Sequence, residues 1–313
     1  MIKYLKTEEG IIHEINEIEE GSWVRMINPT AEECERIAKC VNIDVEDIMA
    51  PLDSEESARL EIQKAHTLII VDIPTIEMEQ DKPMYTTVPL GIILTAQQII
   101  TVCNTDILIL QNFVNNQVRE FSTKKKLRFV YQILNTIALH YQEKLRIIDR
   151  RRMEIEQRVE KTTEDADLIN LHKLESMLVY FATSLHANEV VLNRLIRYKR
   201  LEQYPEDEEL LDDVMIETKQ AIEMTTIYRD IISGTRELMA TIISNRLNNV
   251  MKRLTAITII MAIPTVISGF YGMNVNEAGM PFSDSVYGFM IIGGLTALTG
   301  SITWLALKRK DML

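Results

Sequence analysis

The chain has 313 residues, and its 34 Lys plus Arg against 46 Asp plus Glu give a formal net charge of −12 at pH 7. An acidic chain without a basic stripe is a poor candidate for nucleic-acid binding, because that binding depends on Lys and Arg against phosphates. The charge is also uneven, since the last 60 residues hold three acids and three bases. The composition therefore predicts an acidic soluble body followed by a neutral, apolar tail.

The cysteines and the N-terminus exclude two further classes of protein. Cys34, Cys40 and Cys103 are too few and too unevenly spaced for a disulfide framework, and they lack the paired spacing of a zinc site. We expect all three to be reduced core residues. Residues 1–10 are charged and have no apolar signal core, so no cleaved export signal is expected.

Residues 1–105 are predicted to form an α/β domain. Short β-branched segments between Gly, Pro or acidic turns predict strands. These segments are Ile2–Lys6, Gly10–Ile15, Ser22–Ile27, Arg59–Lys64, His66–Ile73, Thr87–Thr95 and Ile99–Cys103. Thr30 with Glu33 three residues later predicts a capping box at the start of a helix that reaches Val41. A short helix is expected over Val45–Met49, before Pro51.

Long helices are predicted from residue 106 to residue 204, because charged and apolar residues there recur at helical spacing. Glycine is absent between Gly91 and Gly234. The expected antiparallel helices are Ile107–Arg119, Lys125–Lys161 and Asp165–Gln203.

A stalk helix is predicted over residues 205–253. Pro205 is followed by four acidic residues, and both features favour the first turn of a helix. No stop signal follows, so the helix is expected to continue to about Tyr271, a length of about 100 Å at 1.5 Å per residue.

Two uncharged runs of 23 residues, Leu254–Asn276 and Ser285–Leu307, are each long enough to cross a bilayer. Lys and Arg lie before the first run and after the second, which favours the cytosol for both termini. We expect transmembrane helices at 254–275 and 285–307, an external loop at 276–284 and a basic cytosolic tail at 308–313. The alternative is a buried hairpin in a soluble core.

The first run carries a polar stripe. Thr255, Thr258 and Thr265 fall roughly on one helical face. Such a stripe is costly in lipid unless it faces water or a protein partner, so it favours a pore-facing surface. The alternative is that the hydroxyls bond to carbonyls of their own helix. Because two helices cannot enclose an aqueous path, conduction would require several copies around an axis.

At the outer end of the first run stands Tyr271-Gly272-Met273-Asn274. Tyr-Gly-Met-Asn at this point of a two-span C-terminal hairpin resembles the CorA family of magnesium transporters, the two-span Gly-Met-Asn transporters. The resemblance implies an α+β cytosolic domain with long helices, continuous with a transmembrane hairpin and assembled as a homopentameric funnel. It also implies a plasma (inner) membrane protein that admits divalent cations, mainly Mg²⁺ and by extension Co²⁺ or Ni²⁺, and needs no organic cofactor.

The resemblance places a selectivity filter at Gly272, Met273 and Asn274. Mg²⁺ releases its water reluctantly, so a ring of neutral carbonyls from Asn274 suits capture of the hydrated ion. Glu277 and Asp284 of the external loop would raise the local cation concentration. The alternative for Asn274 is a plain helix C-cap.

Counting back from the motif, the family's pore constriction falls on Asn248, Met251 and Leu254. Asn248 would form an inner polar ring, and Met251 with Leu254 a dewetting hydrophobic gate. The other candidate pore residues are Thr255, Thr258, Ala262 and Thr265.

The family's regulatory stalk acid falls on Asp213, beside Asp212. Bound Mg²⁺ would neutralise these carboxylates and keep the ring closed, so that depletion opens it. The alternative is that both acids belong to a solvated helix start.

The chain departs from the family pattern in its loop and its first span. Met280-Pro281-Phe282-Ser283 lacks the acid that usually follows the proline, which leaves the ion preference open. Pro264 stands one residue later than the family proline, and Ala262 is small for a gate position.

Two other functions remain open: a Zn²⁺ transporter of the same family, and a membrane-anchored sensor or scaffold that does not conduct. An enzyme is the least favoured class. His140, His172 and His186 stand apart on charged helices without the spacing of a metal site or a triad.

Overall fold

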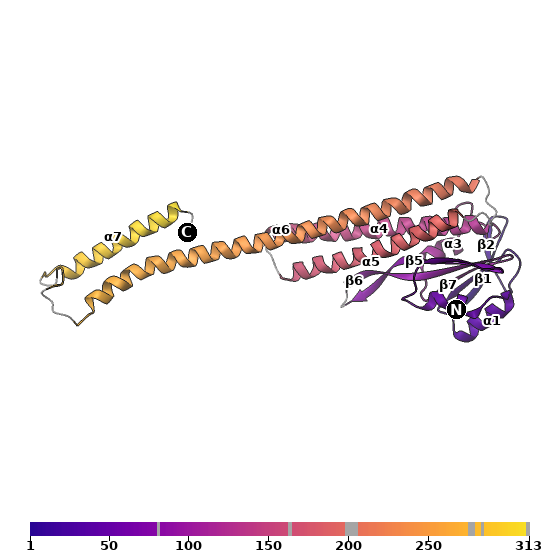
Figure 1. The fold of residues 1–313 in the computed structure, drawn as a ribbon, viewed down its shortest axis with the longest axis horizontal. Coiled ribbons are helices and arrows are strands. Elements are labelled where there is room, and N and C mark those ends of the chain that lie inside the picture. Colours follow the sequence, from indigo (N-terminus) through magenta and orange to yellow (C-terminus); the bar gives the residue numbers. More distant parts are fainter. Residues whose placement is uncertain (80–81, 162–164, 198–205, 275–278, 283–284, 311–313) are drawn as a thin grey trace. The chain divides into compact units, whose positions relative to one another are not determined.

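A computed structural model describes residues 1–79, 82–161, 165–197, 206–274, 279–282 and 285–310 (Figure 1). The chain forms two compact units, Met1–Arg236 and Glu237–Leu313.

The first unit is built on a seven-stranded mixed sheet with strand order β2-β1-β3-β7-β6-β5-β4. Only β3 and β7 pair in parallel, with Trp23 opposite Ile99, while the other neighbours are antiparallel. The strands are β1 (Ile2–Glu8), β2 (Ile11–Ile15), β3 (Trp23–Ile27), β4 (Arg59–Ile62), β5 (His66–Glu79), β6 (Lys82–Thr95) and β7 (Ile99–Cys103).

Helices cover both faces of the sheet. The predicted capping box is confirmed: Thr30 accepts from the Glu33 amide and the Glu33 side chain accepts from the Thr30 amide. The small helices on the first face are α1 (Ala31–Val41), α2 (Val45–Met49) and the 3₁₀ turn η1 (Ala50–Leu52). Those that follow are α3 (Leu108–Val114), α4 (Lys126–Lys161) and α5 (Asp165–Ile196).

Alternation of side chains along the strands divides the core into two layers. Val24 and Ile70 pack with α1 and α2 on one face. On the other face Trp23 meets Phe129 of α4, with ring centroids 4.9 Å apart. The expected mixed domain with long helices is therefore present, with the sheet between two helical layers.

The long hairpin of β5 and β6 exceeds the predicted strands. Each strand has 14 residues and the pairing continues to Glu79 opposite Lys82. Pro74 and Pro83 lie in the extension. Proline has no amide hydrogen to donate to a neighbouring strand, so it normally argues against a strand. For this reason the sequence pattern predicted shorter strands than those observed.

Some helix ends and one cysteine also differ from expectation. Helix α3 ends at Val114 rather than near Arg119, and Asn116 adopts a left-handed conformation with φ of 56°. Helix α5 ends at Ile196, whereas the remaining residues predicted to extend it to Gln203 lie almost wholly outside the described residues. All three cysteines are free, but Cys40 is exposed, so the prediction of a core position was wrong for it.

Helix α6 (Glu206–Tyr271) begins in the first unit with a buried ion pair. The Asp207 side chain is 2 % exposed, and Arg128 Nη1 of α4 donates to its Oδ1 at 3.0 Å. Further along, Gln142 Nε2 donates to both the backbone carbonyl and a carboxylate oxygen of Glu217, at 3.1 and 2.6 Å. These contacts attach the N-terminal part of α6 to α4.

We expect Asp207→Ala to lower the free energy of unfolding by about 3 kcal/mol, because it leaves the Arg128 guanidinium with one buried partner fewer. Urea unfolding of the purified protein, followed by tryptophan fluorescence, measures this loss. Glu208→Ala is the matched control, since that neighbouring side chain is exposed; its cost should stay within about 0.5 kcal/mol. Equal losses of unfolding free energy in the two variants would contradict a stabilising role for the buried pair of Arg128 and Asp207.

Candidate functional site

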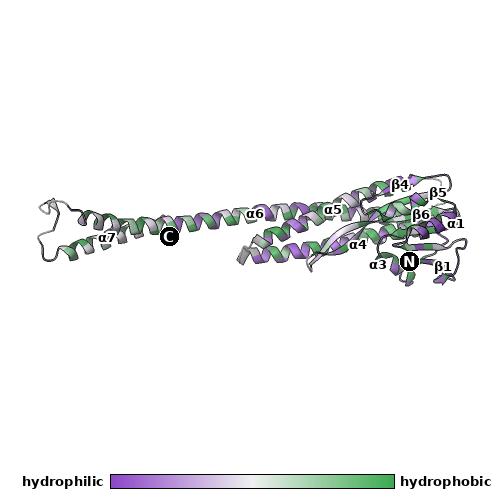
Figure 2. Cartoon of the chain, turned by 90° about the horizontal axis from the view of Figure 1, so that it is seen from below, coloured by the Kyte–Doolittle hydropathy of each residue, from purple (hydrophilic) through white to green (hydrophobic). Residues whose placement is uncertain are grey.

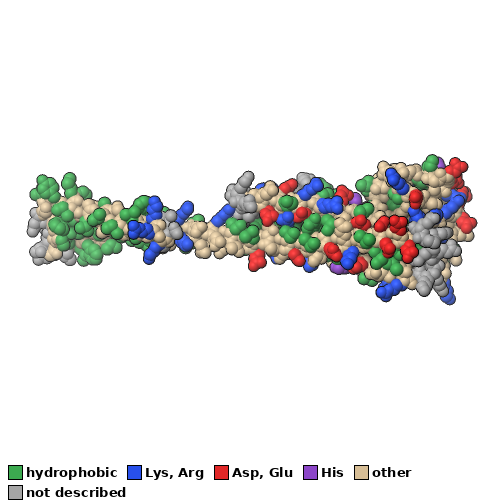
Figure 3. Space-filling view, turned by 90° about the horizontal axis from the view of Figure 1, so that it is seen from above, with side chains coloured by type: hydrophobic (Ala, Val, Ile, Leu, Met, Phe, Trp, Pro, Cys, Tyr) green, Lys and Arg blue, Asp and Glu red, His purple; other side chains and the backbone are tan. Residues whose placement is uncertain are grey.

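The second unit contains the C-terminal part of α6 and helix α7 (Gly288–Arg309). Both α6 and α7 are long and apolar enough to cross a membrane, and few residues of their apolar stretches are buried within the chain. Hydrophobic residues dominate these stretches in Figure 2, and Figure 3 shows basic side chains gathered beside the apolar surface of the hairpin. Lys252 and Arg253 before the apolar part of α6, and Lys308 and Arg309 at the end of α7, are basic residues of this unit.

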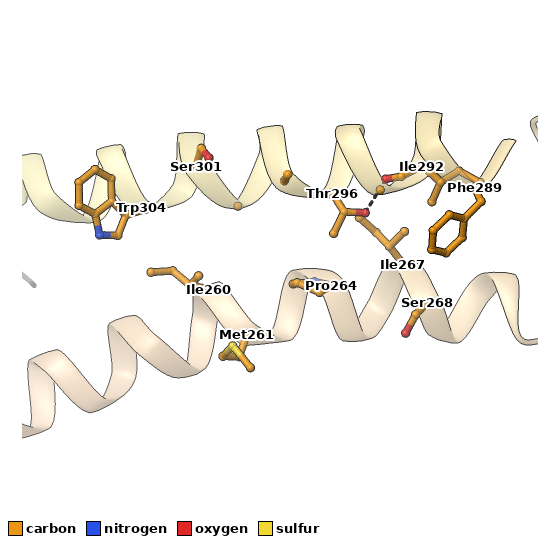
Figure 4. A pocket seen from close by; sticks show the side chains of 13 residues that line it. Ile260, Met261, Pro264, Ile267, Ser268, Phe289, Ile292, Thr296, Ser301 and Trp304 are labelled. Atoms are coloured by element: carbon orange, nitrogen blue, oxygen red, sulfur yellow. Dashed lines mark hydrogen bonds between the residues drawn. The ribbon is translucent and has the colours of Figure 1, made fainter. Parts of the chain in front are cut away.

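One face of α6 in this unit is directed at α7. Its buried and half-buried residues recur every three or four positions, and they are Ala256, Ile260, Ile263 and Ile267. Ile260 and Ile267 line a groove of about 650 Å³ between the two helices (Figure 4). On α7 the groove is lined by small residues such as Gly293, Ala297 and Gly300. This face therefore belongs to the hairpin itself.

The predicted pore residues occupy the other side of α6. All of them are exposed in the single chain: Asn248, Met251, Leu254, Thr255, Thr258, Ala262 and Thr265. At about 100° per residue, they lie roughly opposite the residues directed at α7. The chain thus brings the candidate pore residues onto one helical face that its own hairpin leaves uncovered.

Two hydroxyls of this face bond to their own helix. Thr258 Oγ1 donates to the Leu254 carbonyl at 2.8 Å, and Thr265 Oγ1 donates to the Met261 carbonyl at 2.9 Å. This is the geometry of the alternative interpretation of the polar stripe. The face remains polar, because a hydroxyl that donates its hydrogen still has lone pairs that accept hydrogen bonds. The two threonines therefore present acceptor oxygens to whatever lies against this face.

The Gly-Met-Asn motif follows the end of α6. The Gly272 amide donates to the Ser268 carbonyl at 2.9 Å, which continues the helical pattern one residue past Tyr271. A Cβ at Gly272 would lie 3.3 Å from that same carbonyl oxygen, so glycine relieves a close approach. Met273 and Asn274 are both exposed. The amide of Asn274 is thus presented beyond the helix end.

The loop between the helices is tied back to α6. Tyr271 Oη donates to the Pro281 carbonyl at 2.8 Å. Phe282 is 51 % exposed and has a φ of 65°. A Cβ at Gly288 would come within 2.4 Å of the Phe282 carbonyl oxygen, so only glycine fits there. The candidate loop acids Glu277 and Asp284 lie outside the described residues.

Asp212 and Asp213 are exposed on α6, next to Val214, which is fully buried. Within the described parts of the chain, no group of three or more His, Cys, Asp or Glu side chains could hold a metal ion. The assignment of Asp213 to a regulatory site stays a prediction.

The contacts of Asp207 and Glu217 with α4 were not predicted. The acidic residues after Pro205 predicted a helix start because acids interact favourably with the positive end of the helix dipole. That argument applies equally to every acid of the first turn, so it did not single out Asp207. The available signal was the apolar stripe of α6: Asp207 lies seven residues before Val214, and therefore on its buried side.

The mixed α/β unit, the long helix α6 and the apolar hairpin define a membrane protein with two C-terminal spans. The family model for the CorA-like Mg²⁺ transporter protein matches residues 19–309. The chain belongs to this family, as its Gly-Met-Asn motif and two-span plan predicted.

Individual relatives agree with this assignment. The cobalt/magnesium transport protein CorA of Methanocaldococcus jannaschii is 28 % identical over 277 residues, which are 87 % of this chain and 85 % of that protein. The complete structure of the CorA magnesium transporter from the same organism matches with a TM-score of 0.86 at 26 % identity, covering 100 % of this chain and 99 % of that one.

A third likeness concerns the fold alone. The cytoplasmic domain of ZntB from Vibrio parahaemolyticus matches with a TM-score of 0.60 at 10 % identity, over 79 % of this chain and 97 % of that one. Because the identity is low, this match carries no statement about the ion.

Proposed function

We propose that this chain is one subunit of a homopentameric channel that admits Mg²⁺ through the plasma membrane. The observation that carries the proposal is the exposed polar face of α6, which lies opposite the face directed at α7 and leads to Gly272-Met273-Asn274. Two helices cannot enclose water, whereas five copies of this face around an axis can. The basic ends of the hairpin favour a cytosolic position for both termini.

The polar face suits a hydrated cation. Water molecules bound to Mg²⁺ point their hydrogens outward, so they are hydrogen-bond donors toward the wall of a pore. The hydroxyls of Thr258 and Thr265 donate hydrogen bonds to backbone carbonyls, and their oxygens can still accept hydrogen bonds. Asn274 adds an amide carbonyl at the entrance. We infer that the path recognises Mg²⁺ with its water shell, because that shell is released reluctantly.

The gate is assigned to Met251 and Leu254, which are 53 % and 57 % exposed in the single chain. Rings of apolar side chains around a narrow axis exclude water and thereby block ions. Asn248 would supply a polar ring on the cytosolic side of this constriction. The external acids Glu277 and Asp284 would attract cations to the entrance.

Uptake by liposomes tests the proposal. Purified protein in vesicles that contain a Mg²⁺-sensitive dye should take up Mg²⁺ under an inside-negative potential, and the same vesicles should be assayed with Co²⁺ and Zn²⁺. Mg²⁺ uptake above that of protein-free vesicles supports the channel. Uptake of Zn²⁺ without Mg²⁺ would assign the chain to zinc transport, and no uptake of any of the three ions would leave an anchored sensor or scaffold.

Regulation is assigned to Asp213 with its neighbour Asp212. Asp213→Ala should lessen closure by internal Mg²⁺, so that the concentration giving half-closure rises about tenfold, because one carboxylate per regulatory site is lost. Vesicles loaded with graded Mg²⁺ concentrations measure this value. Glu209→Ala, an exposed acid of the same helix, is the control. Unchanged closure in Asp213→Ala would remove this residue from the regulatory site.

A further inference from the structure

A small pocket in the first unit lies apart from every residue assigned above. It is formed by α4, α5 and the beginning of β6, and its volume is about 250 Å³. Its apolar part includes Ile155, Leu174 and Met177, and its polar part includes Asn170. Ligand pockets combine such an apolar lining with a few polar groups, and this one is below the usual volume for a drug-sized ligand.

The charge of the pocket is opposite to that of the chain. Among its described lining residues, Arg151, Arg158 and Lys173 are basic and Glu154 is acidic. These described lining residues therefore carry a formal charge of about +2, in a protein whose net charge is −12. In an acidic protein, such a concentration of cations at one concave site is the feature expected of an anion site.

Arg151 is held in position without a carboxylate. Its Nη1 donates to the Pro83 carbonyl at 2.9 Å, and its guanidinium lies over the Tyr85 ring, with Cζ 5.2 Å from the centroid. Over the described ranges, no acid lies within ion-pair distance of it. The next residue, Arg152, contrasts with it, because Asp149 and Glu156 accept from its guanidinium at 2.8 and 2.5 Å. Arg151 is therefore a fixed cation with N–H donors to spare.

Arg158 is only loosely paired. Among the described carboxylates, that of Asp167 is the one within ion-pair distance, at 3.5 Å, a separation longer than a charge-assisted hydrogen bond. An anion in the pocket could bond to this guanidinium with better geometry. The fork of an arginine matches the oxygens of a phosphate in two parallel bonds.

We propose that this pocket binds a phosphate monoester carried on a small apolar group. A monoester has a charge of about −1.5 to −2 at pH 7, which matches the lining. The phosphate oxygens bond to Arg151 and Arg158, Lys173 adds positive charge to the lining, and the apolar part of the ligand contacts Ile155 and Leu174. The same chemistry exists in a soluble metabolite and in the headgroup of a lipid, and the two sources are separated by experiment.

Binding to the full-length protein tests the site. In detergent solution, calorimetry with phenyl phosphate serves as the soluble probe, because it is a monoester on a small apolar ring; in nanodiscs, phosphatidic acid serves as the lipid monoester and phosphatidylglycerol as the diester. Binding of phenyl phosphate alone identifies a soluble ligand, and binding of phosphatidic acid alone identifies a lipid. Either result supports the site. Absence of binding by both monoesters, or equal binding of the diester, would overturn it.

Variants that remove one charge from the pocket test whether positive charge strengthens binding of the monoester and negative charge weakens it. Arg158→Gln and Lys173→Gln should each weaken binding about tenfold. Glu154→Gln should strengthen it, because the opposing charge is removed. Arg194→Gln, an exposed cation of α5 outside the pocket, should leave the affinity unchanged. Thermal melting by circular dichroism confirms the fold of each variant. Equal affinities in all four variants would refute the assignment of the binding to this pocket.

Discussion

Replacing Asn274 with alanine is expected to reduce Mg²⁺ uptake by at least about a hundredfold. Each hydrogen bond to the hydrated ion contributes on the order of 1 kcal/mol, and an assembly of five copies loses five carbonyl oxygens at once. The exposed position of Asn274 beyond the end of α6 leaves its amide available for such a ring. Dye-loaded vesicles report the initial rate of uptake.

Asn274→Gln is the matched variant, because it retains an amide carbonyl on a longer side chain. It should preserve a measurable part of the uptake that Asn274→Ala abolishes. Both proteins must reach the membrane with the oligomeric state of the wild type, which native mass spectrometry determines. Uptake by Asn274→Ala at the wild-type rate would exclude this residue from the selectivity filter.

Ala262→Phe is expected to block the channel and lower Mg²⁺ uptake to the background of protein-free vesicles, a loss of at least about tenfold. Ala262 lies on the exposed face of α6, so five phenyl rings would meet at one level of the axis. An apolar constriction of that kind excludes water and hydrated ions. In the proposed pentamer, the small side chain of Ala262 would leave this level of the pore wide.

Ile257→Phe is the control for added volume on the same helix. Ile257 is 53 % exposed and lies about 120° from the centre of the candidate pore face, at about 100° per residue. Its uptake should remain within about a factor of two of the wild type, since most exposed substitutions cost little. If Ile257→Phe blocked uptake and Ala262→Phe did not, the pore would lie on a different face of α6.

The parts of the fold with strong local signals were predictable. The two uncharged runs of 23 residues predicted the hairpin, and the absence of stop signals predicted that α6 continues to Tyr271, where the helix does end. Thr30 and Glu33 predicted a helix start through their mutual hydrogen bonds. Each of these features is decided within one segment of the chain.

Features that depend on distant segments were not predictable. The extension of β5 and β6 is stabilised by their mutual pairing, despite Pro74 and Pro83. The buried pair of Arg128 and Asp207 joins residues 79 positions apart, and no local pattern selects that partner. The pocket around Arg151 likewise exists only when three elements meet.

In the candidate site too, features set by one segment were predictable, whereas features set by other segments were not. The Gly-Met-Asn motif predicted where the proposed entrance lies, and helical spacing placed Thr255, Thr258 and Thr265 on one face. The orientation of that face away from α7 required coordinates, because a single helix does not specify its neighbours. In the proposed pentamer, a ligand opposite Asp213 would come from another subunit, and the sequence of one chain holds no signal for which segments meet across subunits.

Electrical recording of Mg²⁺ current through the purified protein in a planar bilayer tests conduction along α6 most directly. With Mg²⁺ as the permeant cation, the current should reverse at the potential set by the Mg²⁺ gradient, and it should disappear in Ala262→Phe while persisting in Ile257→Phe. A wild-type protein that inserts as an oligomer and carries no Mg²⁺ current would contradict the proposal that this face of α6 lines an ion path.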